Sequence, residues 1–159
     1  MTRRKLTVTS AVLVLLLAVA TVMALQFDLS AIPEPSEKET ALATRAKLLL
    51  VRRAARRVPS PPKASADSLA DGKTRYGVEC AACHGMDGRG QTDYGRWMYP
   101  RAADLTSPRV QAYNDAELFW VVKNGIRLSG MPAFGKVESD EQIWHMVHYL
   151  RSLRATPGQ

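Results

Sequence analysis

Both cysteines of this 159-residue chain fall in one short run, Cys80-Ala81-Ala82-Cys83-His84. Two cysteines cannot form a disulfide framework, and a tetrahedral zinc site needs four ligands, which nothing nearby supplies. A thioredoxin-like redox pair would follow a strand in a βαβ pattern, and the sequence has no such pattern. Cys-x-x-Cys-His is the attachment sequence of a c-type haem, in which two thiols bind the porphyrin and the histidine ligates the iron. The run therefore predicts one covalent haem c on Cys80 and Cys83, with His84 as an axial ligand.

The N-terminus carries an uncharged stretch from Leu6 to Leu25, preceded by three basic residues. At about 1.5 Å per helical residue, twenty residues span roughly 30 Å, the thickness of the hydrocarbon core of a bilayer. This length favours an uncleaved membrane anchor. A secretory signal is the alternative, since Val22-Met23-Ala24 resembles a cleavage site. In both cases the basic residues stay inside, and everything after Leu25 is exported.

The net charge of +7 is spread unevenly along the chain. Residues 1–27 contribute +3, residues 28–66 carry eight cations against four acids, and residues 67–159 carry eleven of each. A nucleic-acid-binding protein needs a basic face on its folded domain. Because the C-terminal segment is neutral, we predict no nucleic-acid binding. The three ranges are the predicted segments: an anchor or signal, a linker, and a haem domain.

The linker is predicted to contain one basic helix. Prolines and three glutamates in residues 28–40 are typical of an extended chain, and Pro59 ends the helix predicted over residues 41–58. Apart from Lys47, one side of this helix is apolar: Leu48, Val51, Ala54, Ala55 and Val58. The arginines lie mainly on the other side: Arg45, Arg52, Arg53, Arg56 and Arg57. The pattern fits a contact of residues 45–57 with anionic lipid or an acidic partner, and equally a solvated spacer or a helix packed on the domain.

Residues 67–159 are predicted to form a small all-α domain, because no period-two alternation typical of a strand is present. Helices are expected over residues 68–79 and 115–124, and a glycine-rich loop over residues 85–95. A capping box at Ser139 starts the last helix, whose predicted buried face is Ile143, Val147 and Leu150. A domain of this size has little apolar core of its own, and a haem supplies the missing hydrophobic volume.

The second axial ligand decides what the haem can do. A thioether stabilises ferrous iron and suits electron transfer, whereas an open position favours gas binding or peroxide chemistry. The candidates are the remaining histidines and the methionines of the domain: Met86, Met98, Met131, Met146, His145 and His148. Met131 is favoured, because its glycine-flanked loop can approach the ring far from His84 along the chain. Met86 is too close to His84, Met98 is cramped, and the three candidates in the last helix are expected to pack or to be exposed.

Three features together carry a family resemblance. Gly72 and Tyr76 precede the haem motif, Met131 stands in a Gly-Met-Pro loop, and Tyr149 lies in an aromatic last helix. In these features residues 67–154 resemble a class I c-type cytochrome. The resemblance implies an all-α domain wrapped around one haem, in which the first and last helices cross at a glycine with aromatic neighbours. Gly72, Tyr76 and Tyr149 match those positions.

The resemblance also implies roles for residues outside the motif. A proline carbonyl often fixes the axial histidine in this family, and Pro100 is the best match. Arg101 and Arg127 are candidate partners of the haem propionates. The runs 99–105 and 124–128 resemble membrane-associated bacterial members, in which the haem is attached outside the cytoplasmic membrane. The haem domain is therefore expected on the periplasmic side of that membrane, or free in the periplasm if cleavage occurs after Ala24.

The predicted function is that of an electron carrier rather than an enzyme. One haem c with His84 and Met131 as ligands would pass single electrons between membrane or periplasmic redox proteins. A peroxidase or gas sensor with an open sixth position is the rival, but the sequence has neither a second haem motif nor a spare histidine outside the last helix. A non-catalytic subunit of an oxidase or dehydrogenase complex would share the chemistry of the carrier and differ in its partners.

Overall fold

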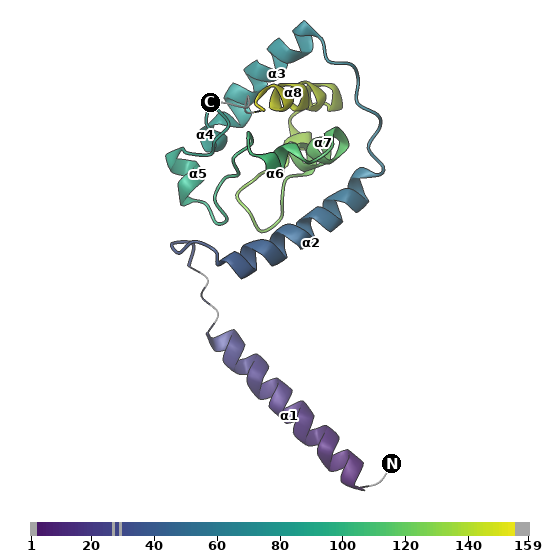
Figure 1. Ribbon diagram of the computed structural model, residues 1–159, viewed down its shortest axis with the longest axis vertical. Helices are drawn as coiled ribbons and strands as arrows, with labels where there is room; N and C mark the ends of the chain where they lie inside the picture. Colours follow the sequence, from purple (N-terminus) through teal and green to yellow (C-terminus); the bar gives the residue numbers. More distant parts are fainter. Residues whose placement is uncertain (1–2, 27, 29, 155–159) are drawn as a thin grey trace. The chain divides into compact units, whose positions relative to one another are not determined.

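The computed structural model describes residues 3–26, 28 and 30–154. The ends of the predicted segments at residues 1–2, 27 and 155–159 lie outside this range. The chain divides into two compact units, Met1–Ser30 and Ala31–Gln159. Every regular element among the described residues is a helix, and none of these residues forms a strand, which confirms the predicted all-α class (Figure 1).

The first unit is built on one helix, α1 (Arg3–Leu25). Its stretch Thr7–Leu25 is 19 residues long with a mean hydropathy of 2.6, and its described side chains are exposed. A helix that is apolar all round must be buried in a larger core or in a membrane. The predicted apolar segment is therefore helical, and by length and composition it could cross a bilayer.

The second unit begins with α2 (Glu37–Ala55), which starts earlier than the predicted helix. Ser36 caps it, since the hydroxyl of Ser36 accepts a hydrogen bond from the Glu39 N–H at 3.2 Å. Glu37 and Glu39 in the first turn also interact favourably with the positive end of the helix dipole. Residues 37–40 are therefore helical, and their assignment to an extended linker was wrong.

The α2 helix packs against α7 (Asp115–Asn124) through the apolar side predicted from the sequence. Val51 is 1% exposed and Ala55 is 5% exposed. Arg52 lies at the edge of this contact, with its Nε 3.4 Å from Oε1 of the buried Glu117. Lys47 is half-buried, and burial, followed by repulsion from Arg109, lowers its pKa. Of the alternatives open for this helix, the structure shows one that packs on the domain.

Two helices of the second unit cross each other, α3 (Ala66–Glu79) and α8 (Asp140–Ser152) (Figure 1). The crossing is at Gly72, where a Cβ atom would lie 2.0 Å from the carbonyl oxygen of His145. Only glycine lets the two backbones approach this closely. Tyr76 and Tyr149 flank the crossing with ring centroids 5.1 Å apart. The predicted crossing of the first and last helices of the domain is confirmed.

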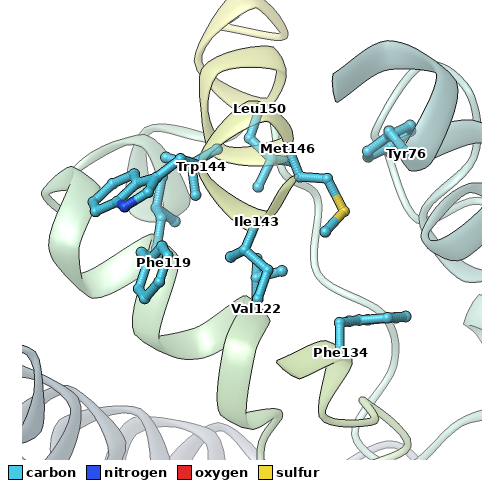
Figure 2. Packing of buried hydrophobic residues seen from close by; sticks show 10 residues of the cluster. Tyr76, Phe119, Val122, Phe134, Ile143, Trp144, Met146 and Leu150 are labelled. Atoms are coloured by element: carbon cyan, nitrogen blue, oxygen red, sulfur yellow. The ribbon is translucent and has the colours of Figure 1, made fainter. Parts of the chain in front are cut away.

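The apolar core lies between α7, α8, α3 and the short 3-10 helix η1 (Phe134–Lys136). Figure 2 shows Val122 of α7 next to Ile143 of α8, with Phe134 of η1 to the right of this pair. Phe119 stacks on Trp144 at 4.4 Å between ring centroids. The predicted buried face of α8 is confirmed, because Ile143, Val147 and Leu150 are all buried. The capping boxes at Ser139 and Asn114 start α8 and α7, and Gly125 with a φ of 66° ends α7.

Three short helices of four or five residues were not predicted. They are α4 (Ala81–His84), α5 (Asp93–Trp97) and α6 (Pro108–Gln111). Thr92 caps α5 and Ser107 caps α6 through side-chain oxygens that accept backbone hydrogen bonds. A single turn is too short to show hydrophobic periodicity, so capping is the one sequence signal that such helices carry. Because α5 begins at Asp93, the predicted loop over residues 85–95 ends earlier than expected.

Candidate functional site

The motif of two cysteines and a histidine occupies one tight turn between α3 and α5. The backbone N–H of Cys83 donates to the carbonyl of Cys80 at 3.2 Å, and that of His84 donates to the same carbonyl at 2.9 Å. Residues three apart on a helical turn lie on the same face, so the two thiols project to one side. Both cysteines are free and half-buried. The turn therefore presents two unpaired thiols and one imidazole within five residues.

The imidazole of His84 is held by a backbone carbonyl. Its Nδ1 lies 2.9 Å from the carbonyl oxygen of Ala103, and since a carbonyl only accepts, Nδ1 carries the proton. Burial lowers the pKa of His84, against the opposing effect of the Ala103 hydrogen bond. Among the described residues, none forms a hydrogen bond with Nε2 of His84. The ring is thus a neutral imidazole with the Nε2 lone pair free, which is the form that ligates metals.

The carbonyl that orients His84 belongs to Ala103. The family resemblance had suggested Pro100 for this role. Backbone bonds explain this placement, because Ala102 donates to Gly95 at 2.9 Å and Leu105 donates to Gly88 at 2.7 Å. These two bonds draw residues 102–105 alongside the loop that follows the motif. Pro100 precedes this segment and is exposed, and its carbonyl is not the one that accepts from His84 Nδ1.

The loop after the motif is hydrogen-bonded directly to the turn of residues 80–84, the predicted haem-attachment turn. Gly90 N–H donates to the carbonyl of His84 at 2.7 Å, and the Thr92 hydroxyl donates to that of Cys83 at 2.9 Å. A Cβ on Gly95 would lie 2.3 Å from the Cys83 carbonyl oxygen, so only glycine fits there. On the other side, the Tyr76 hydroxyl donates to the carbonyl of Gly85 at 2.7 Å. These contacts fix the turn from both sides.

Met131 stands in a loop that is closed by its own backbone. Its N–H donates to the Ser129 hydroxyl at 3.2 Å, and its carbonyl accepts from the Ile126 N–H at 3.3 Å. Met131 is half-buried and packs against the apolar core. Cys80 and Ala81 pack against the same core. The loop and the motif therefore share one apolar cluster, although they lie far apart in sequence.

The other methionines and histidines considered as ligands lie in varied surroundings. Met146 is fully buried in the core, and Met86 is largely exposed. His145 Nδ1 donates to Asp71 Oδ2 at 2.7 Å, and His148 lies between the Ser68 hydroxyl at 3.0 Å and the Pro62 carbonyl at 3.2 Å. The three candidates of α8 thus pack within the domain, as expected.

Met98 is closer to the Met131 loop than the sequence suggested. A Cβ on Gly130 would lie 2.7 Å from the Met98 sulfur, so Gly130 makes room for this side chain. The contact between Met98 and Gly130 could not be predicted from their separation in the sequence, because it forms only where the chain folds back after α5.

The two arginines considered for the propionates are both exposed. Arg101 Nη2 forms an ion pair with Glu34 at 2.7 Å, so it has a partner within the protein. Arg127 lies in the loop between α7 and Met131. Among the described residues, neither arginine forms a hydrogen bond or an ion pair with Cys80, Cys83 or His84.

The donor set fits a haem better than it fits the alternatives. Burial, aided by Glu79, raises the pKa of the Cys80 thiol to about 12, whereas a thioredoxin-type pair needs a lowered thiol pKa. In the described part of the chain, no group of three His, Cys, Asp or Glu side chains could hold a metal ion, as a zinc site would require. The His84 imidazole follows two free thiols directly, and the Met131 side chain packs on the same apolar cluster as Cys80. These groups match the requirements of a covalently held haem iron.

An all-α domain with crossed terminal helices and this motif defines a c-type cytochrome domain. The model of the family described as cytochrome C oxidase, cbb3-type, subunit III matches residues 67–150, more than half of the chain, and the chain belongs to this family. The family places the chain among haem-carrying electron-transfer proteins. The apolar α1 is consistent with association with a membrane.

Known proteins resemble parts of this chain. Cytochrome c-554(547) of Halothiobacillus neapolitanus is 37% identical over 65 residues, which cover 38% of this chain and 66% of the relative. A chain of the reducing HAO-like protein complex of Kuenenia stuttgartiensis matches with a TM-score of 0.57 and 25% identity, over 62% of this chain and 49% of that one. The chain thus spans just under two thirds of the curated relative and about half of the solved chain.

Proposed function

We propose that this protein is a one-electron carrier with a single haem c. Cys80 and Cys83 hold the haem covalently, and His84 and Met131 are the axial ligands of its iron. The observation that carries the proposal is the hydrogen bond from His84 Nδ1 to the Ala103 carbonyl at 2.9 Å, because it places the ring proton on Nδ1 and leaves the lone pair of Nε2 free for iron. The sequence contains one Cys-x-x-Cys-His run, which supports one haem.

Each protein group then has a definite task. The Ala103 carbonyl fixes the tautomer of His84 and makes its Nε2 a stronger donor. The Met131 thioether favours the ferrous state, and the apolar cluster around Met131 and Cys80 excludes water. When bound, the haem supplies the redox chemistry, taking up and releasing one electron at its iron. No substrate needs to be bound or transformed.

The optical spectrum of the ferric protein tests this assignment. Methionine–iron ligation gives a weak far-red band in the ferric form, and we expect that band in the purified haem protein. A ferric spectrum without the band, typical of an open or water-filled sixth position, would instead support the rival peroxidase or gas sensor.

We propose redox proteins of the membrane or periplasm as the partners. The family description names an oxidase subunit, and the solved chain with a similar fold belongs to a redox complex. Both are compatible with a carrier and with a haem subunit that stays docked in a complex. Purification from native membranes in mild detergent distinguishes them, because a subunit co-purifies with its complex at fixed stoichiometry and a carrier does not.

We further propose three segments: an anchor over residues 1–27, a connecting segment over residues 28–66, and the haem domain over residues 67–159. With α1 in the cytoplasmic membrane of a bacterium, the haem domain is on the periplasmic side. This location agrees with the expectation that the basic residues before the apolar span stay in the cytoplasm and that the residues after it are exported.

The anchor predicts how the protein can be extracted. A single apolar span of this length inserts stably, so high salt should leave the protein in the membrane fraction and detergent should release it. Immunoblots of the washed membranes measure this, with N-terminal sequencing as the control. A mature terminus at Leu25 would refute the anchor in favour of a cleaved signal, and would leave the haem assignment untouched.

A further inference from the structure

The α2 helix has a second face, which is exposed within the described part of the second unit. Three leucines on this face are largely exposed: Leu42 by 72%, Leu49 by 70% and Leu50 by 67%. Leu42, Leu49 and Arg53 follow the helical spacing i, i+7 and i+11, so they lie on one stripe. Val51 and Ala55 lie on the opposite side, where they are buried against α7. The exposed leucines are therefore not part of the domain core.

Exposed arginines surround the same stripe. Arg45 lies beside the leucines, and Arg53, Arg56 and Arg57 cover the C-terminal end of the face. Residues 40–66 contain no aspartate or glutamate. Among the described residues, none forms an ion pair with these four arginines, so the surface combines aliphatic side chains with a local excess of positive charge. This combination fits the boundary between the headgroups and the acyl chains of an anionic bilayer.

The connection between α1 and α2 is short enough to keep α2 within reach of a membrane that holds α1. Residues 26–36 connect α2 to the apolar α1. At roughly 3.5 Å per extended residue this connection reaches at most about 40 Å. If α1 is anchored, a bilayer surface is therefore always within reach, and the tether raises its effective concentration.

From these observations we propose that the outward face of α2 lies on the anionic surface of the membrane. Leu42, Leu49 and Leu50 insert among the acyl chains, and Arg53, Arg56 and Arg57 contact the lipid phosphates. An acidic protein partner would satisfy the arginines but would not by itself account for three exposed leucines on the same face.

The contact would orient the haem domain. In the second unit α2 contacts α7, α7 contacts α8, and α8 contacts α3. Figure 1 shows α2 along one edge of this unit and α3 and α4 at the opposite side. A membrane-bound α2 therefore turns the haem-attachment turn away from the lipid, toward partners in the aqueous phase.

Site-specific photo-crosslinking of the full-length haem protein tests the proposal. A benzophenone amino acid replaces Leu49, and separately Val78, which is exposed to a similar extent on α3. The protein is irradiated in native membranes and in vesicles of phosphatidylcholine with and without about one third phosphatidylglycerol. Mass spectrometry identifies each adduct. We expect lipid adducts at position 49 several-fold more often than at position 78, and fewer of them in vesicles without anionic lipid.

A pair of matched charge reversals tests the role of the arginines. Arg53→Glu with Arg56→Glu should reduce lipid adducts at position 49 by roughly fivefold or more, given the attraction of each cation to anionic lipid. Lys73→Glu with Lys136→Glu, an equal charge change elsewhere on the domain, should not. An unchanged haem spectrum confirms that both variants fold. Protein adducts at position 49 in native membranes, or lipid adducts no more frequent than at position 78, would overturn the proposal.

Discussion

Replacing Met131 with alanine is expected to abolish the far-red band of the ferric protein and to lower its reduction potential by roughly 0.1–0.3 V. The thioether prefers ferrous iron, and the choice of axial ligands sets haem reduction potentials over a range of about 0.8 V. Loss of one soft ligand should therefore lower the potential by a substantial part of that range. The loop should keep its shape, because the backbone bonds of Met131 to Ser129 and Ile126 do not involve its side chain. Redox titration followed by optical spectroscopy measures both effects.

Met98→Ala is the matched control for this change. Met98 is another half-buried methionine of the domain, and it lies against Gly130 next to the Met131 loop. Its replacement should leave the far-red band in place and alter the potential much less. If Met131→Ala kept both properties while Met98→Ala lost them, Met98 would be the ligand and the Met131 loop would be the wrong choice.

Gly72→Ala is expected to lower the free energy of unfolding by about 3 kcal/mol, the upper part of the range for overpacked sites. The added Cβ would lie 2.0 Å from the His145 carbonyl oxygen and 3.2 Å from the Met146 nitrogen. Neither atom can rotate away, because both belong to the backbone of α8. The two helices must separate, and the packing of Tyr76 against α8 is disturbed with them. Guanidinium unfolding followed by far-UV circular dichroism measures the loss.

Gly77→Ala provides the control on the same helix. The nearest atom to a Cβ at Gly77 is the sulfur of Met86 at 3.9 Å, an ordinary contact. Since alanine is the better helix former by about 1 kcal/mol, this variant should be neutral or more stable than the parent. Equal destabilisation by the two substitutions would show that the close crossing at Gly72 does not limit stability.

Local signals in the sequence were enough to predict much of the haem domain. Ser139 and Gln142 form a capping box that can be recognised from their spacing in the sequence, and Asn124-Gly125 marks the end of α7. The crossing at Gly72 could be predicted because small and aromatic residues recur there in the family that the domain resembles. These features depend on residues that are neighbours in sequence or that match a known motif.

Other features depend on contacts between distant segments or carry no side-chain signal. The group that orients His84 is the backbone carbonyl of Ala103, and every residue has such a carbonyl. The proximity of Met98 to Gly130 appears only once the chain has folded back. For α2, helical periodicity predicted the apolar side that contains Val51, but it could not say which partner covers that side or that Leu49 would remain outside.

The mass of the polypeptide after extraction with acidified acetone shows whether Cys80 and Cys83 hold a haem covalently. This treatment breaks axial ligation and removes haem that is not covalently bound, whereas thioether bonds survive unfolding. We expect a chain whose mass exceeds that of the mature polypeptide by one haem, and Cys80→Ala with Cys83→Ala should abolish the increase. A parent protein that gave the mass of the bare polypeptide would contradict covalent attachment.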